Sequence, residues 1–95
     1  GTMSVVWRNG NQQTVTLTGD DTVNMTGYIA GQNMRLILCQ DGTGSHAVTW
    51  GTSILWSGGS APSLTGTANH CDVFSFLATM ATSTLKVFGA VTSNF

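Results

Sequence analysis

Within the predicted strand 33–40, the run 34–39, Met-Arg-Leu-Ile-Leu-Cys, is apolar at every position except Arg35. Side chains of a strand point alternately to opposite faces, so Leu36 and Leu38 share one face while Ile37 and Cys39 share the other. A strand that is apolar on both faces is typically buried on both. No segment shows a helical period of apolar positions, so no helix is expected to cover the second face. We therefore expect another copy of the chain to cover it.

The segment 71–79 has the same two-sided character, with Phe74 and Phe76 on one face and Val73 and Leu77 on the other. The segment 14–18 instead alternates apolar residues with threonines, the pattern of a half-buried strand. Asn9-Gly10 is a pair typical of a tight hairpin turn, and Asp41-Gly42 is a second one. The loop 57–69 is too long for a tight hairpin, so we expect it to cross between sheets. The predicted strands are 5–7, 14–18, 23–28, 33–40, 47–50, one ending at Trp56, 71–79 and 84–91.

Short strands without helical segments predict an all-β fold, and we expect an antiparallel β-sandwich with jelly-roll-like topology. Ninety-five residues are enough for one domain. Residues 1–3, Gly-Thr-Met, look like an expression remnant, so we place the domain at 4–95 as the C-terminal fragment of a longer protein. A domain this short buries only a modest share of its surface, which favours assembly with copies of itself.

Charge is scarce: 7% of residues are charged, the net charge is −1, and the only cations are Arg8, Arg35 and Lys86. Three scattered cations cannot form a basic patch, so a nucleic-acid partner is not expected. No apolar run is long enough to span a bilayer and no signal peptide is visible, so membrane insertion is not expected either.

The two cysteines, Cys39 and Cys71, could form a disulfide, remain free or bind a metal ion. We expect free, buried thiols, because both lie in apolar strands and free cysteine is among the most buried residue types. A zinc site with His46 and His70 would have suitable ligands, but adjacent strand residues such as His70 and Cys71 point to opposite faces. One histidine repeated around a three-fold axis remains an alternative. We predict no metal site and no cofactor.

The carboxylates do not suggest catalysis. Asp20, Asp21 and Asp41 lie in predicted turns, where aspartate bonds to the local backbone. Asp72 follows His70 and Cys71, but consecutive strand residues cannot form a catalytic triad. We predict no catalytic residue and no enzymatic activity.

Trp7, Trp50 and Trp56 each end an apolar strand, so we expect them in the core or at a subunit contact, with sugar stacking as the alternative. Arg35 stands among apolar residues, and an unpaired buried charge is costly. We expect it to pair with Asp72 or with a neighbouring subunit. In the alternative, its stem lies over apolar surface and its guanidinium reaches water.

A series of short motifs runs from Gln32 to the end of the chain. In order they are Gln40-Asp41-Gly42-Thr43-Gly44, Trp50, Trp56, Gly58-Gly59, Ala61-Pro62, Leu64, Thr67-Ala68, Asp72-Val73-Phe74-Ser75-Phe76 and Asn94-Phe95. This series resembles the C-terminal domain of bacteriophage tail fibre and tail spike proteins. Residues 4–31 carry no matching motif. In the last strand, residues 86–89 (Lys-Val-Phe-Gly) replace the Trp-Tyr-Gly segment that many members carry.

The resemblance implies a virion protein that forms homotrimers and recognises the bacterial surface. It also implies assembly in the host cytoplasm, where disulfides rarely persist.

We therefore predict a trimeric tail fibre tip that binds a host surface polysaccharide or lipopolysaccharide through polar loops. The first alternative is a purely structural trimerisation module, and the second is a polysaccharide-degrading domain. The predicted subunit contacts are Ile37, Phe74, Phe76, Val87, Phe88 and Phe95. The predicted receptor residues are Asn9, Asn11, Gln12, Gln13, Thr43, Ser45, His46, Ser57 and Ser60.

Overall fold

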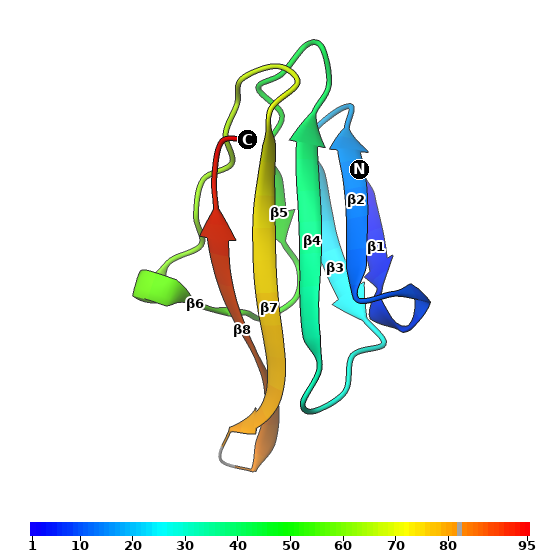
Figure 1. Cartoon of the computed structure of the whole chain (residues 1–95), viewed down its shortest axis with the longest axis vertical. Helices are drawn as coiled ribbons and strands as arrows, with labels where there is room; N and C mark the ends of the chain where they lie inside the picture. Colours follow the sequence, from blue (N-terminus) through cyan, green and yellow to red (C-terminus); the bar gives the residue numbers. More distant parts are fainter. Residues whose placement is uncertain (82) are drawn as a thin grey trace.

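The computed structural model describes residues 1–81 and 83–95 and is almost entirely β (Figure 1). The strands and short 3₁₀ turns are β1 (Thr2–Val6), η1 (Trp7–Asn9), β2 (Gln12–Leu17), β3 (Asp21–Thr26), β4 (Asn33–Gln40), β5 (Val48–Trp50), β6 (Leu55–Trp56), η2 (Ser57–Gly59), β7 (Cys71–Ala81) and β8 (Thr84–Thr92). They form a small sheet in the order β1-β3-β5 and a large sheet in the order β2-β4-β7-β8-β6. The predicted all-β, two-sheet fold is therefore confirmed.

The first half of the chain winds between the two sheets. From β1 to β6 each strand lies in the sheet opposite to that of the strand before it, so every second strand runs in the same direction. Thr2 of β1 lies opposite Thr22 of β3, and Gln12 of β2 lies opposite Arg35 of β4, both in parallel pairs. The uniformly antiparallel arrangement that we predicted is thus wrong here. The reason is that each connection crosses to the other sheet instead of reversing within one.

The predicted hairpin turn at Asn9-Gly10 is wrong for the same reason. The chain turns through η1, where the Gly10 N–H donates to the Trp7 carbonyl oxygen at 3.1 Å, and then enters β2 in the other sheet. Thr2 and Met3, which we assigned to an expression remnant, lie in β1 and pair with Thr22 and Val23.

The part of the large sheet formed by β4, β7 and β8 is antiparallel, as predicted, whereas β6 pairs with β8 in parallel. β7 pairs with β4 on one side and with β8 on the other, and the β7–β8 hairpin extends beyond the small sheet at the lower end of the view (Figure 1). The predicted alternation of faces is also confirmed. Phe74, Phe76 and Ala78 are buried between the sheets, whereas Ser75 and Leu77 are exposed on the outer face of the large sheet.

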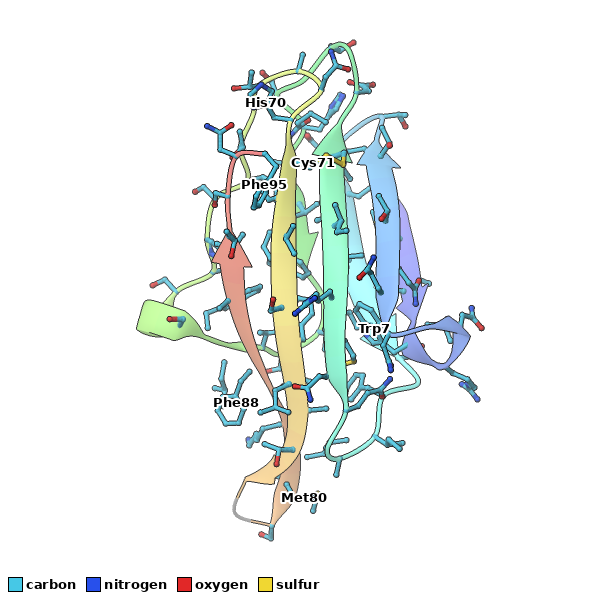
Figure 2. The ribbon with its side chains drawn as sticks, in the orientation of Figure 1. Trp7, His70, Cys71, Met80, Phe88 and Phe95 are labelled. Atoms are coloured by element: carbon cyan, nitrogen blue, oxygen red, sulfur yellow. A yellow bond between two sulfur atoms is a disulfide. The ribbon has the colours of Figure 1, made fainter. Side chains whose placement is uncertain are left out.

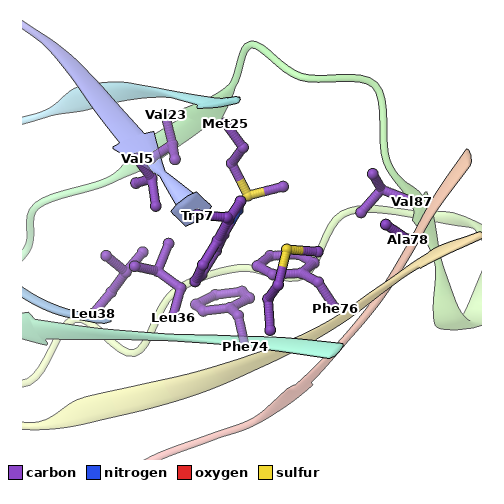
Figure 3. Close-up of a cluster of buried hydrophobic side chains, with 11 residues drawn as sticks. Val5, Trp7, Val23, Met25, Leu36, Leu38, Phe74, Phe76, Ala78 and Val87 are labelled. Carbon is purple, nitrogen blue, oxygen red and sulfur yellow. The ribbon is translucent and has the colours of Figure 1, made fainter. Parts of the chain in front are cut away.

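The core is built around an aromatic cluster, of which Figure 3 shows Trp7, Phe74 and Phe76 among the buried aliphatic side chains. The ring of Trp50, on the small sheet, lies 5.0 Å from that of Phe74 and 5.1 Å from that of Trp56. Trp7, from η1, packs edge-on against Phe76 at 6.2 Å. All three tryptophans therefore belong to the core, one of the two roles that we expected for them. Gly89 makes room for this packing, because a Cβ there would lie 2.9 Å from the Trp56 ring.

Three of the predicted subunit contacts are interior instead. Phe74, Phe76 and Val87 are buried in the core of the single chain, because the small sheet and its loops cover this face of the large sheet. Their placement at a subunit contact was therefore wrong. Ile37, Phe88 and Phe95 remain at least partly accessible.

The two cysteines form a disulfide, so the predicted free thiols are wrong. The register of β4 and β7 places Cys39 directly opposite Cys71 on the outer face of the large sheet. Sequence alone could not reveal this register, because it depends on how the two strands align after the long loop between them. With both sulfur atoms bonded to each other, the zinc site considered for Cys39, His46, His70 and Cys71 is also wrong.

We predict that the disulfide contributes to stability. It closes a loop between residues 32 positions apart, and such cross-links typically add about 2–4 kcal/mol to the free energy of unfolding. Denaturant unfolding with and without a reductant should show this difference. The double variant Cys39→Ala/Cys71→Ala should unfold identically in both conditions. Two free thiols per chain, titrated in denaturant without reductant, would contradict the bond.

Candidate functional site

The two ends of the sandwich differ in what they carry. One end, which we call the termini end, holds Gly1, the loop 41–47, the loop 61–70 and Phe95; the Phe95 N–H donates to the Cys71 carbonyl oxygen at 2.8 Å. Figures 1 and 2 show both termini, His70 and Cys71 at this end. The opposite end, which we call the η1 end, holds η1, the loop 27–32 and the tip of the β7–β8 hairpin.

The structure does not bring the predicted receptor residues together. Ser57 begins the η2 turn and Ser60 follows it; this turn lies to one side of the large sheet beside β6 (Figure 1). The others divide between the two ends. At the η1 end are Asn9, Asn11, Gln12 and Gln13; at the termini end are Thr43, Ser45 and His46.

At the termini end, Asp41 organises the loop that follows β4. Its Oδ1 accepts hydrogen bonds from the backbone N–H groups of Thr43 at 3.0 Å and Gly44 at 3.1 Å, and lies 2.9 Å from His46 Nε2. The Gly44 N–H is the largest cause that lowers the pKa of Asp41 below its ordinary value of 3.8; partial burial opposes it, and the Thr43 N–H and His46 lower it further. Asp41 thus fixes the loop as an anion.

Two buried polar side chains tie this loop to the one before β7. Gln40 donates to the carbonyl oxygens of His46 and Thr65, and accepts from the His46 N–H. Asp72 accepts from the N–H and hydroxyl of Thr65 at 2.7 and 2.8 Å, and from the Asn94 N–H at 2.8 Å. Buried polar groups satisfied in this way rigidify a structure. The termini end is therefore a set of loops bonded mainly to one another.

Gly44 allows the two loops to approach. Its φ is +72°, and a Cβ there would lie 2.6 Å from the Gly66 carbonyl oxygen. Only glycine fits this combination of left-handed backbone and close contact. A cavity of about 400 Å³ lies between these loops, lined among others by His46, Trp50 and Pro62.

Asp72 does not pair with Arg35, so that pairing was wrongly predicted, while a pairing of Arg35 with a neighbouring subunit stays a prediction. Asp72 points into the interior, whereas Arg35 is exposed on the outer face of β4, opposite Ser75. The odd-numbered positions of β4 face outward, and the even-numbered positions of β7 face inward. The alternative, in which the guanidinium reaches water, fits the position of Arg35.

At the η1 end, a shallow cleft of about 530 Å³ lies between η1 and the loop 27–32; its lining is Trp7, Arg8, Gly10, Asn11, Gly27, Tyr28, Ile29 and Gln32. Gly27 follows the last residue of β3 and has a φ of +74°. A Cβ at this position would lie 3.2 Å from the Arg8 backbone nitrogen. This glycine therefore lets the loop after β3 lie directly against η1.

Hydrogen bonds fix the rim of the cleft. The Gln32 side chain donates to Asn11 Oδ1 at 2.5 Å and accepts from the Ile29 N–H at 3.0 Å. The Gly31 N–H donates to the Ala78 carbonyl oxygen at 2.7 Å, which holds the loop to β7. Gln13 is not free to bind a ligand with its amide N–H groups, since they donate to the carbonyl oxygens of Val6 and Gly10.

Sequence reasoning selected Asn11 but missed Arg8, Tyr28 and Gln32 as parts of this cleft. The only local signal was Gly27, which marked an interruption of the strand. It did not indicate that the next loop packs against a turn about 20 residues earlier in the chain.

The outer face of the large sheet exposes an apolar row. The register aligns Leu77 of β7, Phe88 of β8 and Leu55 of β6 side by side on this face. Leu77 is 40% exposed, Phe88 39% and Leu55 48%. Ile37 and Val73 lie opposite each other on the same face, half-buried. Phe95 is exposed at the termini end, away from this row (Figure 2).

Within residues 1–81 and 83–95, no group of three or more histidine, cysteine or acidic side chains is placed to hold a metal ion. His70 is bonded through Nδ1 to the Asn94 side chain at 2.6 Å.

A protein family described as "Putative phage tail fibre C-terminal domain" matches residues 2–79. The chain belongs to this family. The match includes residues 4–31, for which we saw no motif, and stops before β8. Comparison with curated proteins gave no significant match, and comparison with solved structures gave none either.

A phage tail fibre domain is a component of the virion, as predicted. Among the described residues, no helix has the length and apolar character needed to cross a membrane.

We predict that Gly44→Ala lowers the free energy of unfolding by about 1–3 kcal/mol, because it forces a side chain into left-handed backbone against Gly66. Gly42→Ala is the matched control in the same loop, since a Cβ there meets nothing within 4 Å. Denaturant unfolding of the two variants measures the difference. Equal stabilities would show that the two loops are not held in close contact.

Proposed function

We propose that this tail fibre domain binds a glycan on the surface of the host bacterium, and that the cleft at the η1 end is its binding site. Membership of the tail fibre family carries the proposal. The position of the cleft, at the end opposite both termini, supports it.

The termini restrict how the domain can sit in a fibre. The Gly1 amine donates to the carbonyl oxygen of Asp20, just before β3, and Phe95 pairs with Cys71 at the start of β7. A polypeptide that continues from either terminus would leave at this end. The η1 end would then remain free to face the host.

The chemistry of the cleft also suits a sugar. Its polar rim consists of the amides of Asn11 and Gln32, and its wall includes the half-buried ring of Tyr28. Amides bond to hydroxyl groups through both donors and acceptors, and an amphipathic ring can pack against a sugar face. Shallow sites of this kind bind weakly one at a time, and several copies in one fibre would raise the avidity.

We propose that the copies form a homotrimer through the outer face of the large sheet. The apolar row of Leu77, Phe88 and Leu55 supports this arrangement, because burying the exposed part of each such side chain would stabilise the assembly by about 1 kcal/mol. Ile37 and Phe88 remain predicted contacts. Phe95 lies outside the row and remains a prediction without this support.

Assembly in the host cytoplasm is also part of the proposal. Thiols are kept reduced in that compartment, so the bond between Cys39 and Cys71 would close after the virion is released.

The apolar row equally favours a second function, that of a structural trimerisation module with recognition elsewhere in the fibre. Trimers that adsorb to no host cell would favour this module. We propose binding without turnover; release of reducing sugar ends from host polysaccharide by the domain would favour the polysaccharide-degrading alternative.

We predict that Asn11→Ala weakens binding of the labelled domain to host cells by about tenfold, because it removes both a rim amide and the partner of Gln32. Thr43→Ala is the control, since it changes another exposed loop residue at the termini end. Flow cytometry of cells over a range of domain concentrations gives both affinities. If only Thr43→Ala weakened binding to the cells, the glycan site would lie at the termini end and not in the cleft.

We predict that Leu77→Ser shifts the trimer towards monomer in sedimentation velocity, whereas Leu85→Ser does not. Leu77 and Leu85 are leucines of almost equal exposure, 40% and 41%, on opposite faces of one hairpin. Thermal unfolding of both variants checks that the subunit itself stays folded. A monomeric wild-type domain, or equal effects of the two variants, would contradict assembly through this face.

A further inference from the structure

The charged side chains of this domain are separated by sign. All four acids are at the termini end: Asp20 just before β3, Asp21 at its start, Asp41 after β4, and Asp72 at the start of β7. All three cations lie towards the opposite end. Arg8 belongs to η1, Arg35 is near the start of β4, and Lys86 is in the first half of β8.

This separation leaves the cleft end positively charged. Arg35 and Asp41 are about 20 Å apart along β4, at about 3.3 Å per residue. The backbone N–H of Arg35 donates to the backbone carbonyl oxygen of Asn11 at 2.7 Å. Because Asn11 lines the cleft, the cleft lies at the same end of β4 as Arg35. Because the Debye length is about 8 Å at physiological ionic strength, the distant carboxylates hardly reduce the potential there.

Arg8 is the cation within the cleft. It lines the cleft, it is exposed, and it takes part in no ion pair among the residues that the structure describes. No acidic residue occurs in either of the two segments that form the cleft, 7–11 and 27–32. Its guanidinium presents five donors in a planar fork that matches carboxylate and phosphate oxygens.

We propose that the cleft at the η1 end binds an anionic sugar, one that carries a carboxylate or a phosphate, with Arg8 contacting the anion and the amides of Asn11 and Gln32 contacting hydroxyl groups. This inference rests on the proposed glycan-binding function and narrows it to one chemical class. The hydrogen-bonded rim holds the amides in place, so that little ordering is needed when the sugar binds.

Two pairs of probes show whether the anionic group of the sugar is a carboxylate or a phosphate. Tetragalacturonate and its neutral methyl ester test a carboxylate. The core oligosaccharide of the host lipopolysaccharide, before and after phosphatase treatment, tests a phosphate. Calorimetric titration of the purified domain should give an affinity about tenfold higher for the anionic member of at least one pair, the size of one hydrogen bond to a charged group. The preference should fall when sodium chloride rises from about 0.1 M to about 1 M, which shortens the Debye length from about 10 Å to about 3 Å.

The variants Arg8→Gln and Arg35→Gln show which arginine causes the higher affinity for the anionic probe. Both remove one exposed positive charge from the same end of the domain, but Arg35 lies outside the cleft. Arg8→Gln should abolish the preference for the anionic probe and leave binding of the neutral probe unchanged, whereas Arg35→Gln should retain most of the preference. Equal losses with the two variants would reduce the role of Arg8 to that of a distant charge and overturn the proposal.

Failure of this inference and failure of the proposed function give different results. A wild-type domain that binds anionic and neutral sugars equally overturns the anion site and keeps glycan binding. A wild-type domain that binds neither host cells nor any of the four probes overturns both.

Discussion

The packing of Phe74 and Phe76 against the tryptophans joins the two sheets, and the rest of the structure depends on it. Trp50 and Trp7 come from the half of the chain that winds between the sheets, whereas the two phenylalanines come from the antiparallel hairpin. Each buried aromatic side chain removes about 150–250 Å² from water. Since the small sheet has few strands, this contact holds it against the large one together with aliphatic residues such as Val23 and Leu36.

That packing also decides which surfaces remain for function. With the phenylalanines turned inward, Ser75, Leu77 and Phe88 must face outward, because neighbouring positions of a strand lie on opposite faces. The apolar row on the outer face is therefore a consequence of the same strand alternation that buries the phenylalanines. The same winding brings η1 beside the loop 27–32 and forms the cleft.

The two ends of the domain illustrate two uses of polar residues. At the termini end, the side chains of Gln40, Asp41 and Asp72 form hydrogen bonds with the backbone of the loops. These bonds make the loops rigid and leave few of the polar groups there without a partner. At the η1 end, Arg8 has no ionic partner among the described residues and lies in a cleft. Groups that remain unpaired are the ones available to a ligand.

By itself the sequence determined the all-β class, the division of 33–40 and 71–79 into two alternating faces and the resemblance to tail fibres, and it left the tryptophans to the core or a subunit contact. These follow from alternation and from local residue order. The tertiary structure alone decided the parallel winding, the pairing of Cys39 with Cys71, the burial of Phe74 away from any partner, and the cleft with Arg8. Each of these depends on which strands become neighbours and in what register, and alternation within a single strand carries no information about its neighbour.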